Sequence, residues 1–261
     1  MPLTERFVDW IVAGITTRRD PFVVGVNGPQ GCGKSTLAAQ TCARLAERGL
    51  HAAHVSIDDF YLTHAEQRSL AARHAGNSCL AVRGYPGTHD VGLGERVIDA
   101  LCEPDGTARV PRYDKGAFNG EGDRAPEADW PVVELPLKVV IVEGWMLGFV
   151  PVDEATIDDE DLRVSNTALA TYAGWTRRLD ALLHLDATDP TYVLDWRVDA
   201  ERARRRRDGR GLSDAEARQY VERFLPAYAA WTPGLRARWP ISGPCLRVAI
   251  GSDRRPVESS R

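Results

Sequence analysis

The stretch GPQGCGKS at residues 28–35 constrains this chain more than any other part of its sequence. It follows the apolar, β-branched run 21–27 and precedes a segment, 35–49, whose apolar residues recur at helical spacing. The motif therefore predicts a turn between a buried strand and a helix, which is the setting of a phosphate-binding loop. Glycines let backbone N–H groups point inward at phosphate oxygens, and the helix N-terminus adds positive partial charge. We expect this loop to bind a nucleoside triphosphate.

The loop and the first helical turn supply the residues expected to contact the nucleotide, which are Gly28, Pro29, Gln30, Gly31, Cys32, Gly33, Lys34, Ser35 and Thr36. Lys34 is expected to act in catalysis by reaching the β- and γ-phosphates of ATP, and Ser35 to place its hydroxyl on Mg²⁺. Three of the 33 basic residues are lysines. A lysine at 34, where a compact charge is required, fits this assignment and draws attention to Lys115. For Cys32 we expect an inert small side chain rather than an oxidation-sensitive thiol.

The composition is typical of an α/β protein from a reducing compartment. With 261 residues, 43% of them hydrophobic, the chain can bury one substantial core, so we expect a single domain over 1–261. It should contain an N-terminal helix (1–20), a lid with the helix that follows it (191–231) and a flexible tail (252–261). The net charge of −4 argues against nucleic acid as a partner. No apolar run reaches the ~20 residues of a membrane span, and five cysteines without regular spacing indicate reduced thiols in the cytoplasm. The sequence does not predict an oligomeric state.

Carboxylates follow two further apolar runs that are typical of strands. Glu143 follows the run 139–142, and an acid at the carboxyl end of a strand beside the phosphate loop can hold Mg²⁺. Asp58 and Asp59 follow the run 51–57. Phosphoryl transfer to an alcohol needs a carboxylate within reach of the attacking hydroxyl, so we expect Asp58 to act as the base and to contact the metal. Asp59 is expected to support the metal or cap the next turn. The alternatives are a surface acid at Glu143 and an Asp-Asp helix cap.

Two loops rich in glycine and proline, within 83–101 and 110–126, are expected to bind the phosphoryl acceptor. Cations in the second loop suit a small anionic, hydroxylated molecule; the alternative is a surface loop whose charges pair with one another. In the first loop a short polar side chain can hydrogen-bond hydroxyl groups, although Asp90 is equally well placed to cap a helix. The expected acceptor residues are Tyr61, Arg83, His89, Asp90, Arg112, Tyr113 and Lys115.

An arginine-rich segment near the C-terminus predicts a lid. A helix from about Thr191 ends in a run of arginines and glycines, and the capping box SDAE at 213–216 starts the next helix. Two helices joined in this way can close over a transferring phosphoryl group, whose charge guanidinium groups neutralise. We expect Arg207 and Arg210 to act in catalysis; the alternative is a solvated helix face.

Taken together these motifs, in the order phosphate loop, SIDDFYL, RGYPGTHD, VPRYDKGAFNGEGDRAP, VEGWMLGF and LSDAEARQYVERFLPAY, resemble the D-glycerate 3-kinase family over residues 20–255. That family is related to the uridine kinase and phosphoribulokinase-like P-loop kinases. The resemblance implies about five parallel strands flanked by helices, and ATP with Mg²⁺. It implies a base at Asp58, a metal acid at Glu143, and acceptor contacts at Asp90 and Tyr113. The implied reaction converts D-glycerate and ATP to 3-phosphoglycerate and ADP. Because plant members carry a plastid-targeting extension that this chain lacks, a cytoplasmic location is expected.

Two other functions are open at this point. The acceptor could be another small hydroxylated metabolite, such as a sugar acid, a polyol, a nucleoside or pantothenate. A P-loop ATPase or switch without an acceptor belongs to a different class, and ATP turnover measured with and without an acceptor separates it from a kinase.

Overall fold

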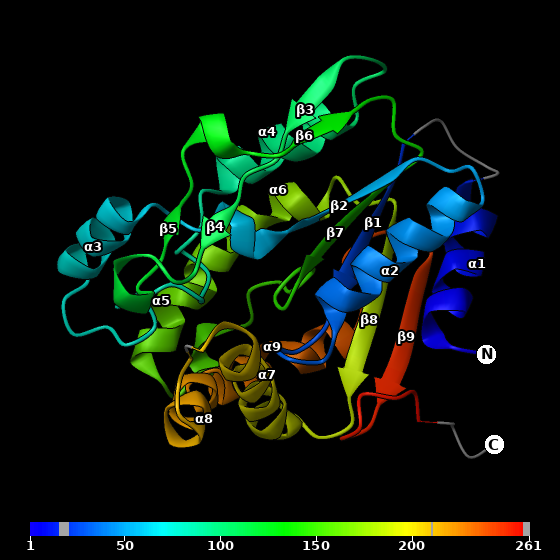
Figure 1. Cartoon of the computed structure of the whole chain (residues 1–261). Coiled ribbons are helices and arrows are strands. Elements are labelled where there is room, and N and C mark those ends of the chain that lie inside the picture. The colour runs from blue at the N-terminus through cyan, green and yellow to red at the C-terminus, as the bar shows by residue number, and fades with distance from the viewer. Residues whose placement is uncertain (16–20, 210, 258–261) are drawn as a thin grey trace.

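A five-stranded parallel sheet forms the centre of the computed structural model, which describes residues 1–15, 21–209 and 211–257 (Figure 1). The strand order is β2-β7-β1-β8-β9, and every neighbouring pair is parallel. The strands are β1 (Phe22–Asn27), β2 (Ala52–Ser56), β7 (Val139–Gly144), β8 (Ala181–Ala187) and β9 (Cys245–Ile250). The predicted α/β class with about five parallel strands is confirmed.

The three central strands, β1, β7 and β8, are buried at every residue. Such continuous burial is expected of a parallel sheet that helices cover on both faces, and it explains why these strands are apolar runs without alternation. Two helices, α1 (Leu3–Ile15) and α2 (Lys34–Glu47), lie together beside the sheet (Figure 1). Aromatic residues of α9 (Leu225–Ala237) pack against the segment that follows β7, where Trp231 contacts Trp145 and Phe149.

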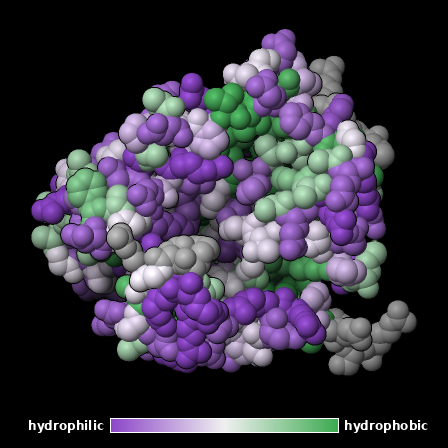
Figure 2. Space-filling model, in the orientation of Figure 1, coloured by the Kyte–Doolittle hydropathy of each residue, from purple (hydrophilic) through white to green (hydrophobic). Residues whose placement is uncertain are grey.

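The remaining elements surround the sheet. The helices are α3 (His64–Arg73), α4 (Val91–Leu101), α5 (Glu160–Leu169), α6 (Ala173–Thr176), α7 (Tyr192–Asp208) and α8 (Asp214–Glu222). Two small antiparallel ribbons pair β3 (Thr107–Arg109) with β6 (Val132–Glu134), and β4 (Tyr113–Asp114) with β5 (Asp123–Arg124). The predicted capping box at Ser213 and Glu216 is present at the start of α8. Figure 2 shows the hydrophilic surface of α7 and α8 at the lower edge of the molecule.

The chain ends were predicted as an N-terminal helix and a flexible tail. The helix is α1, and residues 16–20 of the predicted span lie outside the described residues. Residues 252–257 turn back on β9, where the N–H of Val257 donates to the carbonyl of Ala249 (2.9 Å); residues 258–261 are not described. Within the described ranges, no helix combines the length and the apolarity needed to cross a membrane.

β8 was not singled out as a strand from the sequence. Its run ALLHLDA carries a buried histidine, His184, and a mostly buried aspartate, Asp186, which interrupt an otherwise apolar pattern. Both polar side chains have partners across the carboxyl ends of the strands. The run is therefore a strand whose polar residues are satisfied by tertiary contacts, which a single-sequence pattern does not display.

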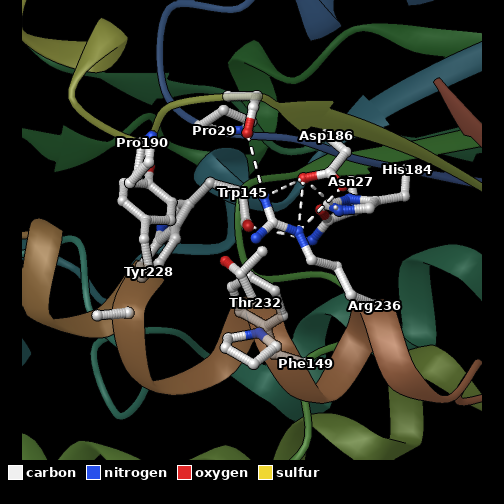
Figure 3. A pocket seen from close by; sticks show the side chains of 13 residues that line it. Asn27, Pro29, Trp145, Phe149, His184, Asp186, Pro190, Tyr228, Thr232 and Arg236 are labelled. Carbon is white, nitrogen blue, oxygen red and sulfur yellow. Dashed lines mark hydrogen bonds and ion pairs between the residues drawn. The ribbon is translucent and has the colours of Figure 1, made fainter. Parts of the chain in front are cut away.

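Those partners form a polar network behind the phosphate loop (Figure 3). Asn27, at the end of β1, donates both amide hydrogens, to the carbonyls of Trp145 (3.1 Å) and Leu147 (2.8 Å). Its carbonyl oxygen lies 2.7 Å from Nδ1 of His184, so that nitrogen must carry the proton and donate. The network lines a cavity of about 100 Å³ between the strand ends and α9.

The charged end of the network joins β8 to α9. The guanidinium of Arg236 donates through Nε (3.0 Å) and Nη2 (2.7 Å) to Asp186, and Nε2 of His184 lies 3.5 Å from the same carboxylate. Burial alone would raise the pKa of Asp186, but His184 and Arg236 outweigh it and hold that pKa at about 2. The network thus fixes the ends of β1 and β8, from which the phosphate loop and α7 follow.

We expect Asn27→Ala to lower the free energy of unfolding by about 1–3 kcal/mol, because it leaves two buried carbonyls and the Nδ1–H of His184 without their partner. Urea unfolding followed by circular dichroism measures this change. The exposed Arg68 on α3 provides the control, since Arg68→Ala should alter stability by less than about 0.5 kcal/mol. Equal effects of the two substitutions would contradict the structural role of the network.

Candidate active site

The phosphate loop connects β1 to α2 in the predicted strand-turn-helix arrangement. Gly31 and Gly33 have positive φ angles of 78° and 97°, a backbone region that favours glycine. At Gly31 a side chain would also collide with α7, because a Cβ atom there would lie 2.7 Å from Cβ of Trp196. The loop is therefore shaped by local backbone conformation and by contact with the helix that follows β8.

Lys34 is buried at the first position of α2, and its Nζ donates to the carbonyl of Pro29 (3.0 Å). This contact holds the ammonium across the loop. The N–H of Gln30 donates to the hydroxyl of Tyr228 on α9 (3.0 Å). The side chain of Cys32 is buried, and burial raises the pKa of its thiol, in line with an inert small residue.

Ser35 and Glu143 form the part of the site expected to hold a metal ion. The Ser35 hydroxyl donates to the carboxylate of Glu143 (2.6 Å), which is 3% exposed at the end of β7. Both residues line a cavity of about 320 Å³, whose other residues are His54, Ser56, Asp58, Asp59, Arg112 and Lys115. We call it the metal-side cavity.

The donor set fits Mg²⁺, which prefers hydroxyl and carboxylate oxygens and takes many of its ligands from phosphates and water. In the part of the chain that the structure describes, no group of three or more His, Cys, Asp or Glu side chains could hold a metal alone.

Asp58 lies in a short 3₁₀ helix, Ile57–Phe60, directly after β2. Its carboxylate accepts hydrogen bonds from Nζ of Lys115 (2.5 Å) and from the hydroxyl of Tyr61 (3.0 Å). Burial alone would raise the pKa of Asp58, but the Lys115 ammonium, supported by Lys34, outweighs it and holds the pKa well below its usual range. The residue predicted as the base is thus ionised and paired.

Asp59 has a different role from its neighbour. One carboxylate oxygen accepts from the N–H of Tyr113 (3.0 Å), and the other lies 3.3 Å from the guanidinium of Arg112. Asp59 therefore fastens the loop that carries Lys115 to the end of β2. The sequence analysis expected Asp59 to support the metal or cap a turn, and this tethering contact was missed.

A second cavity, of about 360 Å³, opens between Asp58 and α7. We call it the lid-side cavity. Its lining residues are Gln30, Asp58, Tyr61, Arg83, Lys115, Arg197, Ala200, Glu201, Ala203, Arg204 and Tyr220. Four cations face two carboxylates in this set, so the cavity suits an anionic molecule.

Arg207 and Arg210 are the arginines predicted to reach the phosphates. Arg210 lies outside the described residues, and so does the side chain of Arg207. Two other arginines of α7 face the lid-side cavity. Arg197 pairs with Glu201 (2.6 Å), whereas the guanidinium of Arg204 has no hydrogen bond or ion pair with any residue that the structure describes.

Of the predicted acceptor residues, Tyr61, Arg83 and Lys115 line the lid-side cavity, and Arg112 lines the metal-side cavity instead. Tyr113 is buried, with its ring edge against Tyr61 at 5.2 Å between centroids. The structure thus brings together part of the predicted set and divides it between two cavities.

His89 and Asp90 line neither cavity. Asp90 caps α4, where it accepts from the N–H of Leu93 (2.8 Å), and its other oxygen lies 3.6 Å from Arg124. His89 is buried against Tyr61, its Nδ1 lies 2.9 Å from the hydroxyl of Tyr172, and burial lowers its pKa to about 3. Helix capping, which the sequence left open for Asp90, is present, and His89 supports the ring of Tyr61.

The sequence analysis missed Arg197, Glu201, Arg204 and Tyr220 as cavity residues. The first three recur at spacings of four and three on α7, which places them on one helix face. The sequence spacing predicts that these residues share a helix face, but whether that face lies toward Asp58 depends on the packing of α7.

A phosphate loop, a strand-end glutamate beside its serine, and an aspartate between a metal-side and a cation-rich cavity define a P-loop kinase. Comparisons with known proteins agree with this class. The chain is 41% identical to D-glycerate 3-kinase of Arabidopsis thaliana over 246 residues, which covers 91% of this chain and 54% of the plant protein. It is 35% identical to the uncharacterized kinase mug58 of Schizosaccharomyces pombe over 250 residues, covering 91% of this chain and 90% of that protein.

The solved structure of D-glycerate 3-kinase from Cryptococcus neoformans superposes with a TM-score of 0.89 at 28% identity, covering 99% of this chain and 98% of that one. No protein-family model matches the chain. The chain belongs to the kinase family that includes plant D-glycerate 3-kinase and these fungal proteins. It spans about half the length of the plant relative.

We expect Glu143→Gln to abolish the gain in ATP affinity that Mg²⁺ provides, because the amide keeps the shape of the side chain but loses the charge beside Ser35. Calorimetric titration with ATP, in Mg²⁺ and in EDTA, measures the two affinities. Affinity in EDTA should stay close to that of the unsubstituted protein. An unchanged Mg²⁺ effect would remove Glu143 from the metal site.

Proposed function

We propose that this chain is an ATP- and Mg²⁺-dependent kinase that phosphorylates D-glycerate to 3-phosphoglycerate, with Asp58 as the base. The observation that carries the proposal is the position of Asp58, which lines both the metal-side cavity and the cation-rich lid-side cavity. A base between a nucleotide and an acceptor needs this placement, because the hydroxyl must reach the γ-phosphate and the carboxylate together.

In the proposed reaction the acceptor lies in the lid-side cavity. Its hydroxyl oxygen bonds to the γ-phosphorus as the bond to the bridging oxygen of ADP breaks, and ADP keeps that electron pair. The hydroxyl proton passes to a carboxylate oxygen of Asp58. Lys34 neutralises charge on the phosphates, and Arg204, which has no partner among the described residues, is placed to do so from α7. Ser35 and Glu143 would hold Mg²⁺, which when bound neutralises charge on the β- and γ-phosphate oxygens.

Charge supports a small anionic acceptor. Lys115 and three arginines, Arg83, Arg197 and Arg204, surround a cavity that contains the carboxylates of Asp58 and Glu201. Glycerate carries one carboxylate and two hydroxyl groups, which fits such a cavity better than a neutral polyol. The plant and Cryptococcus relatives are D-glycerate 3-kinases by name. A cytoplasmic location stays part of the proposal.

An acceptor panel tests the function. ADP release is followed with Mg-ATP and, in turn, D-glycerate, L-glycerate, glycerol, uridine, pantothenate and ribulose 5-phosphate. Conversion of the product by phosphoglycerate mutase and enolase identifies 3-phosphoglycerate. Selective use of D-glycerate supports the proposal, and selective use of another compound replaces the acceptor. Full ATP hydrolysis without any acceptor would instead identify an ATPase.

Asp58→Asn should leave ATP binding unchanged and lower kcat by roughly 10²–10⁴-fold, the range for a general base. The amide keeps the shape of the side chain and removes the proton acceptor. Steady-state kinetics with the acceptor found in the panel measure kcat, and calorimetry measures ATP binding. Turnover at the original rate would refute Asp58 as the base.

A further inference from the structure

The ion pair of Asp58 and Lys115 lies between the two cavities of the site. Nζ of Lys115 is 2.5 Å from a carboxylate oxygen of Asp58, and these are the two residues that line both the metal-side and the lid-side cavity. The pair therefore stands between the nucleotide and acceptor compartments.

This pairing weakens Asp58 as a base. Its two oxygens accept from the Lys115 ammonium and from the Tyr61 hydroxyl. The Lys115 ammonium, 2.5 Å from one of these oxygens, thus occupies the place from which an acceptor hydroxyl would donate to Asp58. The arrangement seen here is thus a poor catalyst for any acceptor, water included.

Lys115 can leave Asp58 without disturbing its loop. The backbone of the loop is fixed one and two residues earlier, by Asp59 on the N–H of Tyr113 and by β4 pairing with β5. The lysine side chain is half exposed, with a relative exposure of 50%, and its flexible stem carries a point charge that needs no fixed geometry. The lid-side cavity gives its ammonium an aqueous space in which to meet another anion.

We propose that Lys115 determines acceptor specificity by leaving Asp58 for the carboxylate of an anionic acceptor, which frees Asp58 to take the hydroxyl proton. This inference rests on the proposed function. The anionic group of the acceptor is thus what the site recognises, because in its absence the Lys115 ammonium stays bound to Asp58. A neutral polyol such as glycerol can present a hydroxyl but cannot draw Lys115 away. Water fails for the same reason, so hydrolysis of ATP without an acceptor stays slow.

Substitution of Lys115 tests this role. In Lys115→Met, the preference for D-glycerate over glycerol, measured as the ratio of kcat/KM values, should fall by about ten- to hundredfold. ATP hydrolysis without an acceptor should rise, since Asp58 is no longer occupied. Lys115→Arg keeps the charge and should restore much of the preference. Lys138→Met, at an exposed lysine where β7 begins, is the matched control and should change none of these quantities.

Two results would overturn the proposal. Lys115→Met could lower the use of both acceptors by the same factor with hydrolysis unchanged, which would make Lys115 a general contributor of positive charge. A preference that Lys115→Arg does not restore, with hydrolysis still unchanged, would reduce Lys115 to a packing residue.

A second measurement uses the unsubstituted protein. Its three lysines give three side-chain signals in a lysine-labelled NMR spectrum, which Lys115→Met and Lys138→Met assign. With Mg-ADP present, D-glycerate should shift the Lys115 signal, and glycerol at the same concentration should not. A signal that stays in place, in protein that phosphorylates D-glycerate, overturns the inference and leaves the proposed function intact. Absence of D-glycerate turnover in the acceptor panel overturns the function and the inference with it.

Discussion

The register of three parallel strands determines where every reacting group of this protein can lie. Glu143 on β7 is opposite Val26 on β1 and opposite Ser56 on β2. The phosphate loop begins two residues after Val26, and Asp58 follows Ser56 by two. The phosphate loop, the proposed metal ligand Glu143 and the proposed base therefore emerge side by side from one sheet edge. A shift of either pairing would separate them by several ångströms, and hydrogen-bonded strands within a buried sheet resist such a shift.

The proposed reaction places two opposite electrostatic requirements on this edge of the sheet. The phosphates of ATP and an anionic acceptor both need positive charge nearby, and the lid-side cavity supplies it through lysine and arginine side chains. A base must keep some affinity for a proton, which nearby cations reduce. The structure places Lys115 where both requirements meet, 2.5 Å from Asp58 and at the border of both cavities. A single movable ammonium can satisfy the two requirements in succession.

The sequence was sufficient to place those proposed site residues whose position depends on local order along the chain. The phosphate loop, Glu143 and Asp58 each follow an apolar run directly, and parallel strands gather their carboxyl ends at one edge. The hydrogen-bond partners of these groups could not be predicted from the sequence, because those contacts depend on packing between distant segments. Lys115 was singled out as rare, yet its contact with Asp58 spans 57 residues of chain.

Two further differences have the same physical origin. Asp90 could cap a helix or bind a hydroxyl, and the start of α4 beside it accounts for the cap. The arginines of α7 could point in several directions, and their actual direction depends on the packing of that helix, whose Trp196 lies against Gly31 of the phosphate loop. β8 was not predicted as a strand because it contains polar residues, and their hydrogen-bond partners, Asn27 and Arg236, come from other elements.

The two adjacent aspartates after β2 contact different parts of one loop: Asp59 binds its backbone, and Asp58 binds the side chain of Lys115. Asp59 holds the loop through a backbone N–H, a contact that does not depend on the identity of the side chain at 115. Position 115 is therefore free to vary without loosening the loop that presents it. Under the proposed role of Lys115, a substitution at this position would exchange one acceptor class for another while the rest of the site keeps its geometry. The same separation offers protein engineers a single position at which to redirect the enzyme.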